Sequence, residues 1–229
     1  MTLTDTPIFE AAEQGVPKGA VVVIQEAFGV NDHIKDVAQR FAAEGYRAVV
    51  PHLFHREGDP IIPYEDMESA MGHVRKLTLQ GIADDLGVAY AHLHDDGIDD
   101  ARIAVVGFCM GGNVAFLQAH DHSLGAAVTF YGGGIAEGRF GAPALKDLAP
   151  EIKTPWLGLY GDQDKGIPVE QVEQLREAVG KAPVETEIVR YPDAGHGFHC
   201  DARPGHHNPE AAADAWSRTL AWFAKHLQA

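Results

Sequence analysis

The chain has 229 residues and a formal net charge of -15 at pH 7, with 45% hydrophobic and 22% charged residues. This composition is ordinary for a globular protein, and the length favours a single domain over residues 1–229. Because so acidic a chain is repelled by nucleic-acid phosphates and by anionic lipid surfaces, we expect no nucleic-acid partner and no membrane partner.

The two cysteines, Cys109 and Cys200, are too few for a disulfide framework and suit a reducing compartment. The N-terminal segment MTLTDTPIFEAAEQG lacks the basic and apolar regions of a signal peptide, and no apolar run is long enough to span a bilayer. We therefore expect a cytoplasmic protein that is a monomer or a small homo-oligomer.

Short apolar runs alternate along the chain with longer segments of helical periodicity. The predicted strands are Ala20–Gln25, Arg47–Pro51, Ile103–Gly107, Ala126–Tyr131, Trp156–Tyr160 and Glu185–Tyr191. The predicted helices are His33–Glu44, a segment Tyr64–Asp95 that Gly72, Gly81 and Gly87 divide, Asn113–Ala119, Val169–Gly180 and Pro209–Leu227. This alternation predicts an α/β fold, a mostly parallel sheet with helices on both faces.

The most informative segment is VVGFCMGGN, which contains the pattern Gly-x-Cys-x-Gly at Gly107, Cys109 and Gly111. With serine at its centre, this pattern is the nucleophile elbow of α/β-hydrolases, and it needs a strand before it and a helix after it. Small neighbours let the backbone fold back sharply, and the positive end of the following helix favours a thiolate. The sequence therefore predicts Cys109 as a nucleophile, against the alternative of a buried cysteine in a glycine-rich turn.

A thiol nucleophile needs a base and a group that orients the base, and α/β-hydrolases supply the acid and then the histidine after the nucleophile. The strand Trp156–Tyr160 is followed by Asp162 and Asp164. We choose Asp164, with Asp162 as the close alternative. His196 lies between two glycines after the last predicted strand and is the predicted base.

The segment Gln25-Glu26-Ala27-Phe28-Gly29 follows the first buried strand at the same carboxyl edge of the sheet. A carboxylate there is costly unless it is paired, so Glu26 is a candidate catalytic residue; a solvated loop glutamate is the alternative. The backbone N–H groups of Ala27 and Met110 are the predicted oxyanion hole, because this fold builds it from an early loop and the residue after the nucleophile.

These motifs together resemble the dienelactone hydrolase (carboxymethylenebutenolidase) family. The matching pieces, in order, are QEAFGVN at 25–31, GFCMGG at 107–112, GDQDKGIP at 161–168 and AGHGF at 194–198. The resemblance implies a Cys–His–Asp triad of Cys109, His196 and Asp164, and a glutamate, Glu26, that contacts the cysteine and helps to generate thiolate. It implies lactones and activated esters as substrates, and no cofactor or metal.

The sequence departs from the family at the position four residues after the catalytic histidine. The best-known members have a substrate-binding arginine there, whereas this chain has Cys200. Arg203 is a candidate replacement. Arg56 and Arg75 lie in the segment where the resemblance implies another carboxylate-binding arginine, but neither aligns with it. We also predict substrate contacts from Phe28, Tyr131 and Phe198.

Two further groups of residues receive structural interpretations. His196, His199, His206 and His207 lie close in sequence, but their spacing on a loop is not typical of a zinc site, so we expect no metal. Trp216, Trp222 and Phe223 have helical spacing and are expected in the core.

The sequence thus predicts a hydrolase that opens ester or lactone bonds through an acyl-enzyme on Cys109. A thioesterase or acyl transferase with the same cysteine is a second hypothesis. A non-catalytic small-molecule binding or redox-sensing protein on the same fold is a third, because fold alone does not fix function.

Overall fold

A seven-stranded sheet forms the centre of the protein, and the computed structural model describes residues 5–13 and 15–228. The strand order is β1-β3-β2-β4-β5-β6-β7. All neighbouring strands are parallel except β1 and β3, which run antiparallel. The strands are β1 Ile8–Ala11, β2 Ala20–Ile24, β3 Arg47–Pro51, β4 Ile103–Phe108, β5 Ala126–Phe130, β6 Trp156–Gly161 and β7 Thr186–Tyr191.

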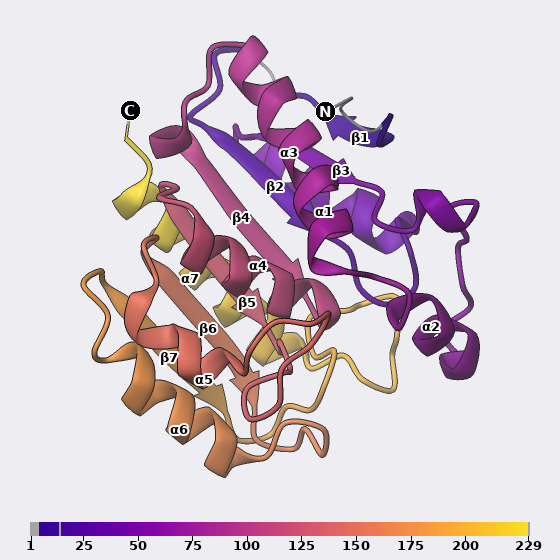
Figure 1. Ribbon diagram of the computed structural model, residues 1–229, viewed down its shortest axis with the longest axis vertical. Coiled ribbons are helices and arrows are strands. Elements are labelled where there is room, and N and C mark those ends of the chain that lie inside the picture. The colour runs from indigo at the N-terminus through magenta and orange to yellow at the C-terminus, as the bar shows by residue number, and fades with distance from the viewer. Residues whose placement is uncertain (1–4, 14, 229) are drawn as a thin grey trace.

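Helices cover both faces of this sheet (Figure 1). They are α1 Asp32–Ala43, α2 Met67–Val74, α3 Leu79–Asp95, α4 Met110–Asp121, the short α5 Leu145–Leu148, α6 Val169–Val179 and α7 Pro209–His226. Phe41 of α1 packs on Trp216 and Phe223 of α7, with ring centroids 4.4 and 5.7 Å apart, so these two helices share one face. The predicted core positions Trp222 and Phe223 are buried, and Trp216 is partly buried against them.

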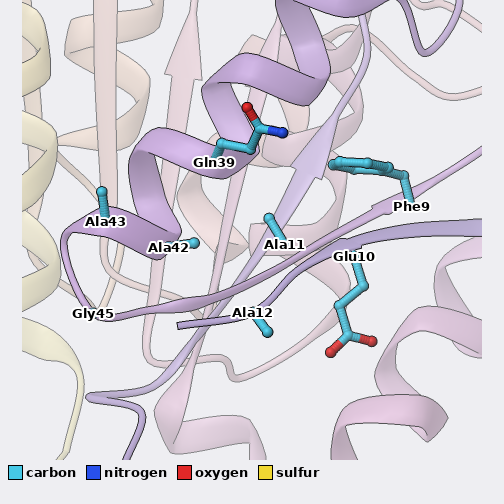
Figure 2. Close-up of a pocket in the computed structure, with 8 residues that line it drawn as sticks. All are labelled: Phe9, Glu10, Ala11, Ala12, Gln39, Ala42, Ala43 and Gly45. Atoms are coloured by element: carbon cyan, nitrogen blue, oxygen red, sulfur yellow. The ribbon is translucent and has the colours of Figure 1, made fainter. Parts of the chain in front are cut away.

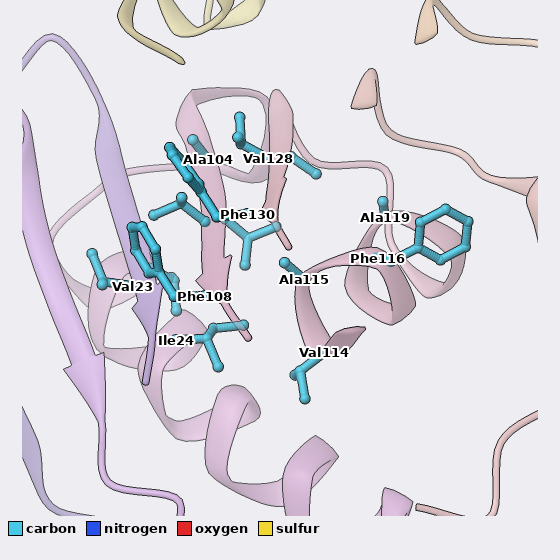
Figure 3. Close-up of a cluster of buried hydrophobic side chains, with 14 of the residues drawn as sticks. Val23, Ile24, Ala104, Phe108, Val114, Ala115, Phe116, Ala119, Val128 and Phe130 are labelled. Carbon is cyan, nitrogen blue, oxygen red and sulfur yellow. The ribbon is translucent and has the colours of Figure 1, made fainter. Parts of the chain in front are cut away.

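The centre of the core lies where β2, β4 and β5 run side by side. Every residue of these three strands is buried, as expected for strands covered on both faces. Phe108 and Phe130 are register partners on β4 and β5, and their rings stack at 4.7 Å (Figure 3). The carboxyl end of β4, where the predicted nucleophile lies, is therefore surrounded by closely packed core side chains.

The predicted mostly parallel α/β fold is confirmed, and all six predicted strands form within one or two residues of their expected ends. The sequence interpretation missed the edge strand β1. It also misplaced the break in the segment Tyr64–Asp95, which falls between Val74 and Leu79 rather than at Gly72, Gly81 or Gly87. Thr78 caps α3 by accepting a hydrogen bond from Gly81 N, so this glycine lies inside the first turn of the helix.

Among the described residues, no helix has both the length and the apolar character that a bilayer span requires. The single domain over residues 1–229 stays a prediction, and residues 1–4, 14 and 229 lie outside the described part of the chain.

Candidate active site

The nucleophile elbow forms at the carboxyl end of β4. Cys109 has φ 57° and ψ -117°, a left-handed conformation that is rare for a residue with a side chain, and α4 begins at the next residue. A Cβ atom on Gly107 would lie 1.9 Å from the carbonyl oxygen of Gly111, and one on Gly111 would lie 2.5 Å from that of Ile24. The two glycines are thus required by close backbone approach, as the sequence pattern predicts.

His196 and Asp164 meet in the loops that follow β7 and β6. The distance from His196 Nδ1 to Asp164 Oδ2 is 2.6 Å, and Asp164 is buried. The second oxygen, Asp164 Oδ1, accepts a hydrogen bond of 2.8 Å from Gly166 N. The carboxylate is therefore fixed in place, and it fixes the orientation of the imidazole in turn.

Cys109 and Asp164 both act on the imidazole of His196. Burial alone would lower the pKa of His196, but the negative charge of Cys109 and the hydrogen bonds to Asp164 and Cys109 outweigh it and raise this pKa to about 10. An imidazolium is thus favoured as long as the cysteine carries a negative charge. The three segments that hold these side chains are far apart in sequence and converge at one edge of the sheet.

The alternative acid, Asp162, has a different partner. Its two carboxylate oxygens accept hydrogen bonds of 2.7 Å each from Nε and Nη2 of Arg190, in a bidentate ion pair on β7. This pairing leaves Asp164 as the carboxylate that contacts the imidazole.

Glu26 lies buried at the end of β2, with only 1% of its surface exposed. Its Oε1 accepts a hydrogen bond of 3.4 Å from the Tyr131 hydroxyl, and no described group bonds to its Oε2. Burial, together with the charges of Glu26, Cys200 and Cys109, raises the pKa of Tyr131 well above its usual range, so the phenol stays protonated. Tyr131 also has a positive φ of 40°, a strained conformation of the kind found at functional sites.

The two backbone N–H groups predicted for an oxyanion hole lie in buried residues, Ala27 and Met110. Within the described chain, neither N–H donates to a carbonyl group or to a side chain. Met110 is the first residue of α4, where N–H groups point outward without partners from their own helix. Both donors are thus free to bind an oxyanion.

Arg203 lies on the side of the site formed by Phe28 and Tyr64. Its guanidinium carbon is 5.3 Å from the centre of the Phe28 ring and 5.2 Å from that of Tyr64, and it donates a hydrogen bond of 3.1 Å to His206. Cys200 is buried below it, with Sγ 3.5 Å from the Tyr64 hydroxyl. Burial and the charge of Glu26 raise the pKa of Cys200 to about 11, so this second thiol stays neutral.

The other sequence candidates lie in the packed interior. Phe198 has no exposed surface and packs against Tyr131 and Tyr191, and Phe28 is 2% exposed beneath Tyr64 and Arg203. His199 lies between Phe108, Phe130 and Trp216 rather than beside His196. Substrate contacts by the two phenylalanines stay a prediction.

A cavity of about 80 Å³ lies directly at the nucleophile. Its wall includes Cys109, Met110 and His196, as predicted, together with Ile167 and Arg139, which the sequence interpretation missed. Arg139 belongs to a loop between β5 and α5 that has no periodicity and no motif, so its neighbourhood was invisible in the sequence. A second hollow of about 670 Å³ between β1 and α1 is a poor candidate, because it lies near Gly45 at the amino ends of the strands and contains no nucleophile (Figure 2).

A parallel sheet with a strained cysteine between strand and helix, followed in chain order by an aspartate and a histidine that bond to each other, defines an α/β-hydrolase. The signature of the dienelactone hydrolase family matches residues 6–227. The chain belongs to this family and is a carboxymethylenebutenolidase-like hydrolase.

Relatives of known sequence and structure agree with this assignment. A Salmonella typhimurium protein with the provisional name carboxymethylenebutenolidase is 41% identical over 220 residues, which cover 95% of this chain and 80% of the relative. One from Methylorubrum extorquens is 38% identical over 93% of this chain and 74% of its own length. The crystal structure of a provisionally named dienelactone hydrolase from Klebsiella pneumoniae superposes with a TM-score of 0.88 at 38% identity, covering 96% of this chain and 92% of that one.

Proposed function

We propose that this protein hydrolyses lactone or ester bonds through a Cys109–His196–Asp164 triad and an acyl-enzyme intermediate. The observation that carries the proposal is the cavity in which Cys109 and His196 share a wall, with Asp164 2.6 Å from the far nitrogen of the imidazole. Because Asp164 occupies Nδ1, the other ring nitrogen, Nε2, is the one that exchanges protons with sulfur and substrate.

In the first step, the thiol proton of Cys109 passes to His196 Nε2, Sγ attacks the carbonyl carbon, and the carbonyl oxygen becomes an oxyanion that the N–H groups of Ala27 and Met110 stabilise. The C–O bond then breaks, His196 gives a proton to the leaving oxygen, and the acyl group stays on sulfur as a thioester. In a lactone, the new hydroxyl remains attached to the acyl group. Water, deprotonated by His196, attacks the thioester and releases the acid and the cysteine.

Glu26 and Tyr131 would control the charge state of the cysteine. The neutral phenol of Tyr131 donates to Glu26 Oε1, while the unpartnered Oε2 remains able to accept a hydrogen bond from the thiol before its proton passes to His196. Arg203, which lies against the rings of Phe28 and Tyr64, is the proposed contact for an anionic or polar part of the substrate.

The central test compares Cys109→Ala with the matched control Cys200→Ala. We expect Cys109→Ala to keep the circular dichroism spectrum and melting temperature of the parent protein but to lose turnover of an activated aryl ester and to form no acyl adduct detectable by intact mass. Cys200→Ala should keep both the turnover of the ester and the formation of the acyl adduct, since this buried thiol is neutral and lies outside the cavity. Full turnover by Cys109→Ala would refute the mechanism, and a parent protein that is never acylated would favour a non-catalytic binding role.

A further inference from the structure

Gln25 is a fully buried amide at the start of the loop that carries Ala27, one of the two predicted oxyanion-hole donors. The residue follows directly on β2 and has no exposed surface. Burial of a side-chain amide is costly unless both its oxygen and its nitrogen are hydrogen-bonded. The groups that bond to this amide therefore define its role.

The oxygen and the nitrogen of the Gln25 side chain bond to two different segments. Its Oε1 accepts a hydrogen bond of 3.1 Å from Leu53 N, in the loop that follows β3. Its Nε2 donates a hydrogen bond of 3.3 Å to the carbonyl oxygen of the next residue, Glu26. No backbone N–H among the described residues donates to this carbonyl. The first contact thus anchors the side chain on the neighbouring loop, and the second holds the Glu26 carbonyl.

The Glu26 carbonyl and the Ala27 N–H belong to the same peptide group. A peptide group is planar and trans, so its carbonyl and its N–H point in opposite directions. A hydrogen bond that fixes the direction of the Glu26 carbonyl therefore also fixes the direction of the Ala27 N–H. Without that bond, the peptide group can rotate about the two single bonds that flank it, and its N–H then turns away from the oxyanion.

Other contacts fix the backbone on either side of this peptide group. Before it, the carbonyl oxygen of Gln25 lies so close to the nucleophile elbow that a Cβ atom on Gly111 would be 2.5 Å away. After it, the carbonyl oxygen of Phe28 accepts a hydrogen bond of 3.1 Å from Ile62 N. The ends of the loop are thus held independently, and the Gln25 side chain sets the orientation of the peptide group between them.

We propose that Gln25 is a positioning residue, which holds the Glu26–Ala27 peptide group so that the Ala27 N–H points into the oxyanion hole. The inference rests on the proposed hydrolysis at Cys109, in which this N–H stabilises the oxyanion. The negative charge on the carbonyl oxygen develops only as sulfur attacks, so the donor matters most in the transition state. Loss of the Gln25 amide should therefore lower kcat and leave KM nearly unchanged.

The test replaces the amide by an apolar side chain of similar length, in Gln25→Met. We expect kcat for an activated aryl ester to fall about a hundredfold, with KM changed by less than about twofold. An aryl trifluoromethyl ketone should also inhibit about a hundredfold less tightly. In that adduct Cys109 Sγ bonds to the ketone carbon, the thiol proton passes to His196, and the ketone oxygen becomes an oxyanion. Alkylation of Cys109 by iodoacetamide should keep its rate, because sulfur then displaces iodide and no oxyanion forms.

Two further variants separate this role from a general loss of packing. Gln25→Glu keeps an oxygen that can accept from Leu53 N, but at about pH 9 its ionised carboxylate has no proton to donate to the Glu26 carbonyl, so it should lose kcat as Gln25→Met does. It also serves as the test where loss of both hydrogen bonds prevents Gln25→Met from folding. The matched control is Gln118→Met, which removes another buried amide, one that accepts a hydrogen bond of 3.0 Å from the Tyr90 hydroxyl. This control should keep the kcat of the parent protein.

The inference is overturned if either variant of Gln25 keeps the kcat of the parent protein, or if Gln118→Met loses as much kcat as they do. It is also overturned if ester turnover, inhibition by the ketone and alkylation by iodoacetamide all fall by the same factor in Gln25→Met. A parent protein that iodoacetamide alkylates at Cys109, but that no ester acylates and no ketone inhibits, would instead count against the proposed mechanism.

Discussion

His199 should make the protein sensitive to acid, and replacing it with leucine should remove part of that sensitivity. The ring is 3% exposed and lies against Phe108, Phe130 and Trp216, and its Nδ1 has no partner among the described residues. Burial, followed by the charges of His33, Arg40 and His207, lowers the pKa of His199 to about 3 against the opposing charge of Asp201.

The size of the effect follows from the difference between the folded and unfolded states. An unfolded chain binds a proton on this histidine near pH 6.5, whereas the folded protein does not bind it until about pH 3. The free energy of unfolding therefore falls as the pH is lowered through this window, by about 5 kcal/mol over the whole window. Between pH 6.5 and 4.5 it falls by about 2 kcal/mol, because the histidine of the unfolded chain is already half protonated at pH 6.5. The full contribution of the neutral His199 ring to the free energy of unfolding is present above pH 6.5.

Urea unfolding followed by circular dichroism, at about pH 6.5 and about pH 4.5, measures this difference. We expect the parent protein to lose about 2 kcal/mol more than His199→Leu between these two conditions. His94→Leu is the matched control, because His94 is exposed on α3 and its partner among the described residues is Asp100. This variant should lose as much stability as the parent protein. If His199→Leu and the parent protein lost stability equally, the buried neutral state of His199 would be refuted.

Three further substitutions probe the elbow, the triad and the interior. Asp164→Asn should keep the fold but lower kcat/KM for an aryl ester by about a thousandfold, because the amide no longer stabilises the imidazolium of His196; a loss under tenfold would contradict the triad. Gly107→Ala should lower the melting temperature and the yield of folded protein, since its Cβ would lie 1.9 Å from the Gly111 oxygen; unchanged stability would show that the elbow can relax. Asp85→Asn should cost about 3–5 kcal/mol in urea unfolding, because this fully buried carboxylate is ion-paired; a cost below 1 kcal/mol would contradict that pairing.

Most of the fold was predictable because buried parallel strands have an unmistakable pattern. Runs such as Ala20–Ile24 and Ile103–Phe108 are apolar throughout, since both faces are covered. The strand β1, Ile8–Ala11, was missed because it is only four residues long and contains a glutamate. It also lies at the edge of the sheet, where it pairs with a neighbouring strand on one side only. Its existence depends on antiparallel pairing with β3, which no local pattern reveals.

The break between α2 and α3 was misplaced for a different reason, because the helix boundaries depend on capping residues rather than on glycines. Glycine lowers helix propensity, yet Gly72 and Gly87 lie within helices where a Cβ would meet open space. The stronger determinants are local hydrogen bonds, namely Asp66 accepting from Ser69 N at the start of α2 and Thr78 accepting from Gly81 N at the start of α3. Capping residues, rather than glycines, would have placed both starts correctly.

The candidate site was predictable where regular structure dictates it. Cys109 follows a strand and precedes a helix, and Asp164 and His196 follow strands at the same edge, so the order of elements brought them together. The sequence favoured Asp164 over Asp162 only narrowly, because both follow β6. The choice depends on Arg190, which lies on β7 and engages Asp162.

The position of the two arginines near the nucleophile, Arg139 in the cavity wall and Arg203 beside Phe28 and Tyr64, could not be predicted from regular structure. Arg139 and Arg203 both lie in loops, where position depends on a few particular contacts, such as the Phe140–Leu79 hydrogen bond and the rings of Phe28 and Tyr64. The elbow, by contrast, is fixed by backbone contacts that admit only glycine. A chain of this design can change its loop cations without disturbing the nucleophile, so substrate choice and bond cleavage are separable. On this argument, exchanging the loop cation Arg203 should change substrate preference while an aryl ester is still cleaved at Cys109.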